Sequence, residues 1–316
     1  MRQPFVALTL PTFLLCLSGL ASAEFDTERL ALAGDNRAEL ERALADAAPD
    51  QREGIEFLIA NMPDSDLQTL SADYLLENTR LAYQAWTDAP WAKEIPKDIF
   101  LNSVLPYASI NERRDEWRAD YRKRCLPMME GASSPSEAVA LINQKLFKNV
   151  GVKYSTRRVK ADQSPLESME TGLASCTGLS VLLIDACRSV GIPARFVGTP
   201  LWFNQSGNHS WVEVWDDGWH FTGAAEPTGN ELDRGWFVGN ATKADRSSKA
   251  HAIYATSFKQ TPLSFPCVWN RKLRSIPAVN VTDRYVALQK SLPPGMTESL
   301  FVVHGADGNR ASCRLR

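Results

Sequence analysis

The sequence predicts an α+β protein with a helical N-terminal region, a core in which one helix packs on an antiparallel sheet, and a small C-terminal β unit. From about residue 35 to residue 150, apolar residues recur at spacings of three and four, which is the period of amphipathic helices. After Ile192-Pro193 the pattern changes to the alternation that is typical of strands. From about Val268 onward, short β-like runs continue to the end of the chain.

The helical pattern is clearest in three segments. These are "NRAELERALADAA" (36–48), "SADYLLENTRLAYQAW" (71–86) and "SPSEAVALINQKLFKNV" (134–150). Between the second and third, "DAPWAKEIPKDIF" (88–100) holds two prolines among aromatic residues, which predicts an ordered loop. In "NERRDEWRADYRKRC" (111–125), acidic residues interrupt the basic ones, so we expect a solvated helix face there.

The first 23 residues have the pattern of a secretory signal peptide. A positive Arg2 precedes the apolar run "FVALTLPTFLLCLSGL", and "ASA" (21–23) offers the small residues that a signal peptidase reads. A single membrane anchor is the alternative, but the run is short and contains Pro11. We therefore expect cleavage after Ala23 and an exported protein, either periplasmic or secreted, with no membrane span after cleavage.

These patterns divide the chain into four parts. We predict a signal peptide over 1–23, a helical region over 24–130, a core over 131–266 and a C-terminal β unit over 267–316. The last turn of that unit lies so close to the chain end that the sequence leaves its completeness open. The formal charge of the whole chain is −2, too near neutral to predict a nucleic acid or an anionic membrane as the main partner.

The chain has six cysteines, of which Cys16 would leave with the signal peptide. The remaining ones are Cys125, Cys176, Cys187, Cys267 and Cys313. An odd number in an oxidising compartment leaves at least one free thiol. Up to two disulfides could form among the others, and the sequence does not assign them.

Cys176 is expected to begin a largely apolar helix, "CTGLSVLLIDACRSVG". Ser175 has the residue type of a helix cap, and Gly191 closes the segment. A thiol in the first helical turn lies near unpaired N–H groups and the positive end of the helix dipole, which favour a thiolate. Cys187 follows about three turns later on the same face, roughly 16 Å deeper among apolar residues, so we interpret it as a packing residue.

A catalytic thiol needs a base, and that base needs a group to orient it. The strand-like "HSWVEVW" begins at His209 and is followed by the hairpin signal "DDG" (216–218). If Asp217-Gly218 forms a two-residue turn, His209 lies directly opposite Glu226 on the same face of the sheet. This register predicts Cys176, His209 and Glu226 as a catalytic triad.

The register is the condition on which that triad depends. A bulge at Gly223, or a slip of one residue, would turn Glu226 to the other face of the sheet. In the same register His220 opposes Trp215, which predicts surface or aromatic packing. We expect no function for His251 beyond a neighbouring hydrogen bond, and the sequence around His304 carries no signal.

Five tryptophans lie near the candidate triad in the sequence. They are Trp202, Trp211, Trp215, Trp219 and Trp236. Some of them could line a substrate cleft, and core packing is expected for most. There is no Cys-x-x-Cys pair and no histidine pair at helical spacing, so we expect no bound metal and no cofactor.

The order of the motifs "GLASCTGLSVLLIDACRSVGIPARFVG", "NHSWVEVWDDGWH" and "EPT" resembles the transglutaminase-like superfamily, the relatives of papain-type cysteine proteases. The resemblance covers roughly residues 154–228. It implies a papain-like core with Cys176 as nucleophile, His209 as base and Glu226 as the orienting acid. The usual acid of the family is aspartate, so Asp233 is the substitute if Glu226 is misplaced.

The resemblance implies a cysteine-dependent acyl-transfer enzyme that acts on a protein, peptide or amide substrate. We expect hydrolysis, because water is always present and nothing in the sequence marks a site for an amine. A protein cross-linking transglutaminase is the alternative within the same chemistry. A non-catalytic module that binds peptide or glycan is the alternative from another class. The sequence leaves the substrate and the oligomeric state open.

Overall fold

The computed structural model describes residues 27–289 and 303–305. The expected signal peptide lies outside the described residues, as do Cys313 and most of the last β-like run. Among the helices within those limits, none combines the length and the apolar character that crossing a membrane requires.

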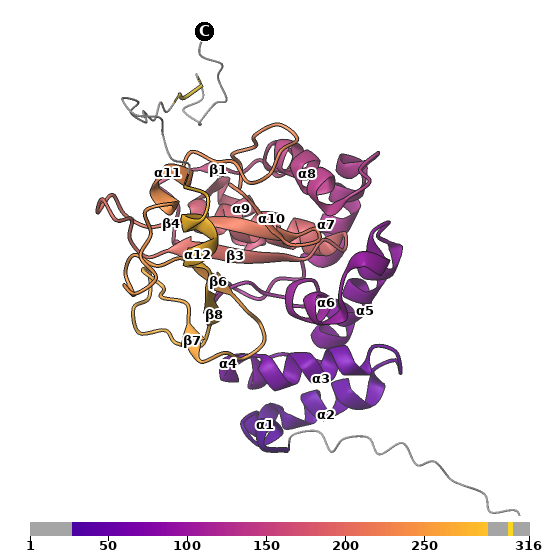
Figure 1. The fold of residues 1–316 in the computed structure, drawn as a ribbon. Helices are drawn as coiled ribbons and strands as arrows, with labels where there is room; N and C mark the ends of the chain where they lie inside the picture. Colours follow the sequence, from indigo (N-terminus) through magenta and orange to yellow (C-terminus); the bar gives the residue numbers. More distant parts are fainter. Residues whose placement is uncertain (1–26, 290–302, 306–316) are drawn as a thin grey trace, which may run out of the picture.

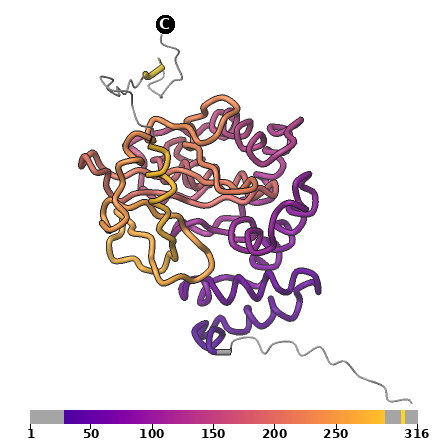
Figure 2. The backbone as a smooth tube through the Cα atoms, in the orientation of Figure 1, coloured from indigo at the N-terminus to yellow at the C-terminus, as the bar shows by residue number. Residues whose placement is uncertain are grey.

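The described residues form an α+β fold. The helices of the first hundred residues gather at one side and one end of the molecule, and the strands lie beside them (Figures 1 and 2). The α-helices are α1 (Thr27–Ala31), α2 (Arg37–Asp46), α3 (Arg52–Asn61), α4 (Asp64–Leu67), α5 (Ala72–Asp88), α6 (Lys97–Ser103), α7 (Arg118–Cys125), α8 (Pro135–Val150), α9 (Pro165–Thr171), α10 (Cys176–Ser189), α11 (Val238–Ala241) and α12 (Thr282–Val286).

The strands form two sheets. They are β1 (Lys153–Tyr154), β2 (Leu173–Ala174), β3 (Ala194–Thr199), β4 (His209–Trp215), β5 (Trp219–Thr222), β6 (Tyr254–Thr256), β7 (Leu263–Ser264) and β8 (Pro277–Asn280). The small sheet pairs β1 with β2 in parallel. The large sheet has the order β5-β4-β3-β6-β8-β7, and each neighbouring pair is antiparallel.

Helix α10 lies against β3 and β4 and is covered on its other sides by α5, α7, α8 and α9 (Figure 1). Every residue from Thr177 to Ser189 is buried. The predicted helix on an antiparallel sheet is therefore confirmed. The apolar cluster around α10 also includes residues of α2, α3 and α5, so the helical region and the sheet share one hydrophobic core.

The opposite face of the sheet carries a second, smaller apolar cluster. Trp211 belongs to this cluster, whereas its neighbour Val212 belongs to the larger one, as the alternation of side chains along a strand requires. Helices α11 and α12 supply Ala241 and Tyr285 to the second cluster. The indole N–H of Trp211 donates to the Tyr285 hydroxyl at 2.7 Å, which ties α12 to β4.

Two local expectations were wrong. Residues 88–100 are not only loop, because helix α6 begins at Lys97, directly after Pro96. A proline at the start of a helix costs no helical hydrogen bond, since an N–H at that position would have no partner within the helix. In the tail, the β-like run after Ile276 gives strand β8 and then helix α12. Strand β8 pairs with β6 and is therefore part of the large sheet. The proposed domain boundaries stay predictions.

The expectation of a solvated face in residues 111–125 was wrong for Arg118. This side chain is buried, and its guanidinium donates to carbonyl oxygens of Val104, Leu105 and Arg188 and to the amide oxygen of Asn78. Burial lowers the pKa of Arg118 to about 9. The charge pattern of the sequence does not reveal this role, because the partners are backbone oxygens from distant segments.

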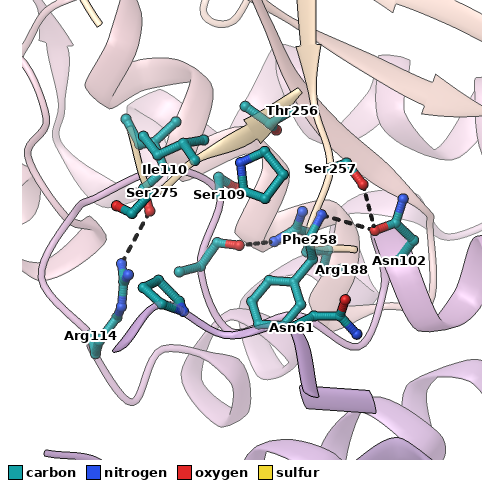
Figure 3. A pocket seen from close by; sticks show the side chains of 14 residues that line it. Asn61, Asn102, Ser109, Ile110, Arg114, Arg188, Thr256, Ser257, Phe258 and Ser275 are labelled. Atoms are coloured by element: carbon teal, nitrogen blue, oxygen red, sulfur yellow. Dashed lines mark hydrogen bonds between the residues drawn. The ribbon is translucent and has the colours of Figure 1, made fainter. Parts of the chain in front are cut away.

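A small cavity of about 30 Å³ lies between the helical region and strands β6 and β8 (Figure 3). The guanidinium of Arg188 lies in this cavity beside Phe258, and it donates to the carbonyl oxygen of Ala108 at 2.8 Å. Asn102 accepts hydrogen bonds from Ser257 and from the backbone N–H of Phe258. The volume suits about one water molecule, so this cavity is no candidate for a substrate site.

The end of α10 closes against α5 through Gly191, whose φ is +78°. A Cβ atom at this position would clash with the carbonyl oxygen of Ala85. The carbonyl oxygen of Gly191 also accepts a hydrogen bond from the Trp91 indole at 3.0 Å. The glycine in the "GIPAR" motif is therefore required both by its backbone conformation and by the close approach of α5.

We expect Gly191→Ala to lower the free energy of unfolding by about 2–4 kcal/mol, because the new methyl group adds a steric clash to the strain of a positive φ. Gly131→Ala is the matched control, since Gly131 has a φ of +85° but no atom within 4 Å of the place that its new methyl group would take. We expect that control to cost about 1 kcal/mol. Equal losses for the two variants in urea denaturation would contradict the close contact.

Candidate active site

Cys176 begins helix α10, and it is the one residue of that helix that is not buried. Strand β2 leads directly into it, and β2 is held in place by its pairing with β1. Ser175 occupies the cap position, but its hydroxyl donates to the carbonyl oxygen of Ala161 instead of capping the helix. The predicted start of the helix and the predicted cap position of Ser175 are confirmed, and the Ser175 side chain forms no capping hydrogen bond.

Cys176 lies against the start of β4. The backbone and hydroxyl of Ser210 and the hydroxyl of Thr177 lie close enough to its thiol to lower the thiol's pKa. The two hydroxyl groups also approach each other at 3.3 Å. This contact joins the cysteine at the end of the helix to the residue that follows His209 in the strand.

Burial raises the pKa of the Cys176 thiol above its usual value, and the nearby Glu226 carboxylate raises it further. The hydrogen bonds from Ser210 and Thr177 act in the opposite direction but do not compensate. This direction is opposite to the stabilised thiolate that the start of a helix was expected to favour. A pKa raised in this direction favours the neutral thiol near pH 7.

His209 is the first residue of β4, pairs with Thr199 of β3, and is buried. Its imidazole lies among four aromatic rings, with centroid distances between 4.7 and 6.0 Å. These rings are those of Trp202, Trp211, Trp236 and Phe237. This packing fixes the orientation of the ring and shields it from solvent.

Glu226 lies on a tight turn that follows β5. Gly223 and Glu226 form an isolated antiparallel bridge, and the N–H of Glu226 donates to the carbonyl oxygen of Gly223 at 3.2 Å. A Cβ atom on Gly223 would lie 2.5 Å from a carboxylate oxygen of Glu226. Gly223 therefore allows the glutamate side chain to fold back over its own turn.

Asn143 of helix α8 holds this turn in place. Its amide nitrogen donates to the carbonyl oxygen of Gly223 at 2.9 Å and to the Thr222 hydroxyl at 3.2 Å. Its amide oxygen accepts the N–H of Ala225 at 3.0 Å. Ala225 has a φ of +61°, an uncommon conformation for a residue with a side chain. The buried amide thus stabilises a strained backbone directly beside Glu226.

The predicted hairpin register was wrong by one residue. Trp215 pairs with Trp219, and Val214 pairs with His220, so the loop has the three residues 216–218 instead of two. Asp217 adopts a φ of +51°, as three-residue hairpin loops with a left-handed residue do. Glu226 reaches the site from the turn after the strand, and not from a position paired with His209.

The indole N–H of Trp236 donates to a carboxylate oxygen of Glu226 at 2.7 Å. The same ring lies 4.7 Å from the imidazole of His209, centroid to centroid. Trp236 therefore contacts both the candidate base and the candidate acid. The sequence placed this tryptophan near the site but offered no sign of its hydrogen bond.

Asp233, the substitute acid, lies elsewhere. Its two carboxylate oxygens accept hydrogen bonds from the backbone N–H of Phe221 at 2.9 Å and interact with the imidazole of His220 at 2.6 Å. Burial lowers the pKa of His220, but the contact with Asp233 outweighs it and raises the pKa overall. Asp233 does not line the cavity that holds Cys176.

A cavity of about 880 Å³ brings the three candidate residues together. Cys176, His209 and Glu226 all line it. Trp202 and Trp236 are the two predicted tryptophans in its lining, and His304 lies there too, which the sequence did not indicate. A cavity of this volume is large enough for a drug-sized ligand or a short stretch of peptide.

The other described cysteines are free and buried. Cys187 is fully buried, which confirms its role as a packing residue. No disulfide is present among Cys125, Cys176, Cys187 and Cys267. Within residues 27–289 and 303–305, no group of three His, Cys, Asp or Glu side chains is placed to hold a metal ion.

Comparison with known proteins finds one family model that matches the middle of the chain. Residues 122–227, which include Cys176, His209 and Glu226, match the family model of the transglutaminase-like superfamily. No curated protein matches the chain. A likeness exists to a solved structure described as "a Putative Cysteine Protease from Cytophaga hutchinsonii", with 19% identity and a TM-score of 0.33.

That likeness covers 43% of this chain and 44% of the other, so the chain spans less than half of that protein. A TM-score of 0.33 is too low to show a shared fold. The family-model match supports the transglutaminase-like superfamily for the central region of the chain.

We expect Glu226→Gln to lower the pKa of Cys176, because the amide removes the negative charge that now raises it. Alkylation of Cys176 by iodoacetamide at pH 7 should become roughly two- to tenfold faster. Mass spectrometry of the labelled peptide across pH 6–10 measures the change.

Glu231→Gln is the matched control for this prediction, because it removes a carboxylate that pairs with Arg234 and does not line the cavity. A slower reaction of the Glu226→Gln protein would contradict the neutral thiol, since it would show that Glu226 supports a thiolate–imidazolium pair.

Proposed function

We propose that this protein is a cysteine-dependent acyl-transfer enzyme that hydrolyses peptide or amide bonds. In this proposal Cys176 is the nucleophile, His209 the general base and Glu226 the residue that orients His209. The observation that carries the proposal is that these side chains, from α10, β4 and the turn after β5, line one cavity. The match of residues 122–227 to the transglutaminase-like superfamily supports it.

The neutral state of the thiol fits a general-base mechanism. Cys176 transfers its proton to His209 as the sulfur attacks the carbonyl carbon of the substrate. The protonated imidazole then gives that proton to the departing amine, and a thioester remains on Cys176. Water, deprotonated by His209, attacks the thioester and releases the acid, which restores the thiol.

The tetrahedral intermediate of each step carries a negative charge on the former carbonyl oxygen. The backbone N–H of Cys176 is suited to stabilise it, because the first N–H groups of a helix have no partner within the helix. The positive end of the α10 dipole lies at the same place. These groups act on the transition state and leave the resting thiol protonated.

Glu226 is a better candidate than Asp233 for the residue that orients His209. Asp233 is bound to His220 and Phe221, whereas Glu226 lies in the cavity and is held by the Trp236 indole. Glu226 lies on a turn and not at the end of a strand. Its side chain is one methylene longer than that of the aspartate that is usual in the family, and this extra length allows the carboxylate to extend further from the turn. We therefore assign the third role to Glu226.

We also propose that residues 1–23 direct export and are removed, so that the enzyme acts on proteins or peptides outside the cytoplasm. The cross-linking alternative differs only in the last step, where an amine replaces water. In the binding-module alternative, the cavity binds a peptide or glycan and Cys176 takes part in no reaction. Product analysis and the reactivity of the Cys176 thiol separate these three possibilities.

We expect residues 24–316 to convert a glutamine-containing peptide mainly to acid in the presence of a labelled primary amine. His209→Ala should lower kcat/KM by about 10²- to 10⁴-fold, because general-base catalysis is lost. Cys176→Ser should abolish turnover. Mass spectrometry distinguishes the acid from the amide product.

If the labelled amide dominates, the protein is a cross-linking enzyme and hydrolysis is wrong. If neither product forms with a broad peptide mixture and Cys176 reacts with iodoacetamide at the same rate in the His209→Ala variant, the binding module is the better assignment.

Trp236→Phe should lower kcat/KM about tenfold, because Glu226 loses the indole N–H that orients its carboxylate. The acidic limb of the pH–rate profile should also move to higher pH, since a hydrogen bond that favours the charged carboxylate is lost. A purely structural role of the ring would not shift this limb.

Trp202→Phe is the matched control, because Trp202 lines the same cavity and packs near His209 but forms no side-chain hydrogen bond within the described residues. A Trp236→Phe profile with the same shape as that of the control would overturn the assignment of Trp236 as a positioning residue.

A further inference from the structure

One wall of the active-site cavity is formed by the end of α8, strand β1 and the loop between them. This wall belongs to residues 138–161, a stretch without a single acidic residue. The same stretch contains six basic residues, which are Lys145, Lys148, Lys153, Arg157, Arg158 and Lys160. The stretch therefore carries an excess of positive charge between Glu137 and Asp162, although the whole chain is near neutral.

Two of these residues, Lys148 and Lys153, line the cavity itself and are exposed. Within the part of the chain that the structure describes, neither ammonium group forms an ion pair with a carboxylate or a hydrogen bond. Other lysines of the stretch are engaged, since Lys160 pairs with Glu167 at 3.0 Å and Lys145 donates to the carbonyl oxygen of Met128 at 2.7 Å. The two lysines in the cavity are the ones left for a ligand.

The pairing of β1 with β2 places this wall close to the nucleophile. Lys153 pairs with Leu173, and the chain reaches Cys176 three residues later. From the usual strand spacing and rise per residue, the two Cα atoms are roughly 11 Å apart. A flexible lysine side chain covers about half of that distance, so its charge acts on a substrate that is bound at the thiol.

The cavity offers little negative charge to oppose the lysines. Glu226 is the one carboxylate among the described residues of its lining, and its side chain is engaged by the Trp236 indole. Lys148 also lies in the last turn of α8, where it complements the helix dipole. Lys153 lies on a strand and has no such role, which leaves the cavity as the reason for its position.

We propose that the cavity selects acidic peptides, with a substrate carboxylate held by Lys148 and Lys153 close to the bond that Cys176 attacks. This inference rests on the proposed function, because it names the substrate class of the same site. The apolar side chains of Phe147, Trp202 and Trp236 line the same cavity and suit the carbon skeleton of a peptide. The mixture of charge and aromatic surface favours a peptide over a uniformly charged polymer.

The first test compares two alkylating agents of nearly equal size, the anion iodoacetate and the neutral iodoacetamide. The ratio of their rate constants at Cys176 reports the local potential and does not depend on turnover. In the double variant Lys148→Gln/Lys153→Gln, the ratio at low ionic strength should fall about tenfold. The difference from wild type should shrink in about 0.5 M NaCl, because salt screens exposed charges.

The double variant Lys93→Gln/Lys123→Gln is the matched control, because it removes the same net charge from exposed positions outside the cavity. Its ratio should equal that of the wild type. An unchanged ratio in the Lys148→Gln/Lys153→Gln protein would overturn the inference.

The second test uses the Cys176→Ala protein, which binds substrate without reacting. The probes are acetyl-(Glu-Ala)5-amide and acetyl-(Gln-Ala)5-amide, and their affinities are measured by titration calorimetry. The acidic peptide should bind at least about tenfold more tightly, and this advantage should be lost in Cys176→Ala/Lys148→Gln/Lys153→Gln. Equal affinities of the two peptides would overturn the inference.

Polyglucuronate in the same assay separates a peptide ligand from a general polyanion. Weaker binding than that of the acidic peptide supports the proposal, and equal or tighter binding overturns the choice of a peptide. Failure of the proposed function has a different signature. The Cys176→Ala protein would still prefer the acidic peptide, while the wild type would release no product from it.

Discussion

The structure depends on the complete burial of helix α10. Its residues 177–189 are enclosed by β3 and β4 on one side and by α5, α7, α8 and α9 on the others, so the helix cannot shift without disturbing every layer. Such close packing leaves the helix little room to move, because protein interiors have few voids. The consequence is local, since Cys176, at the one end of the helix that meets the cavity, is fixed by the whole core.

Helix α10 also buries the ionisable side chains of Arg188 and Asp185, which differ in their hydrogen bonding. The guanidinium of Arg188 is satisfied by carbonyl oxygens of Ser103, Ala108 and Ala194. Asp185 is fully buried, and within the described residues neither of its oxygens accepts a hydrogen bond. Burial raises the pKa of Asp185 well above its usual value, although the guanidinium groups of Arg188 and Arg118 act in the opposite direction.

Much of this arrangement follows from the sequence, and what does not follow has a physical reason. The apolar period predicted α5 and α8, because burial of one face repeats along a helix, and the largely apolar run between Ser175 and Gly191 predicted α10. The hairpin loop could not be settled by residue type, since "DDG" suits both a two-residue turn and a three-residue loop with Asp217 in a left-handed conformation.

Contacts between distant segments have no sequence period and could not be predicted. Asn143 appears in the sequence only as a polar residue beside Ile142 on an apolar helix face, and the turn that it holds lies eighty residues away. Trp236 donates to Glu226 only because the turn after β5 folds back over Gly223. The three candidate residues were predicted from the hairpin register and from the order of the motifs, and the register was wrong.

Among the described residues, the cavity lining contains one carboxylate, that of Glu226, and two lysines, Lys148 and Lys153. Glu226 raises the pKa of Cys176, while the hydrogen bonds that lower it come from Ser210 and Thr177. Lysine is not among the groups that act most on this thiol. If the lysines served to activate the cysteine, they would need to lie against the sulfur and stabilise a thiolate. In our proposal the thiol stays neutral until His209 removes its proton, and the charge of the two lysines in the cavity lining acts on the substrate.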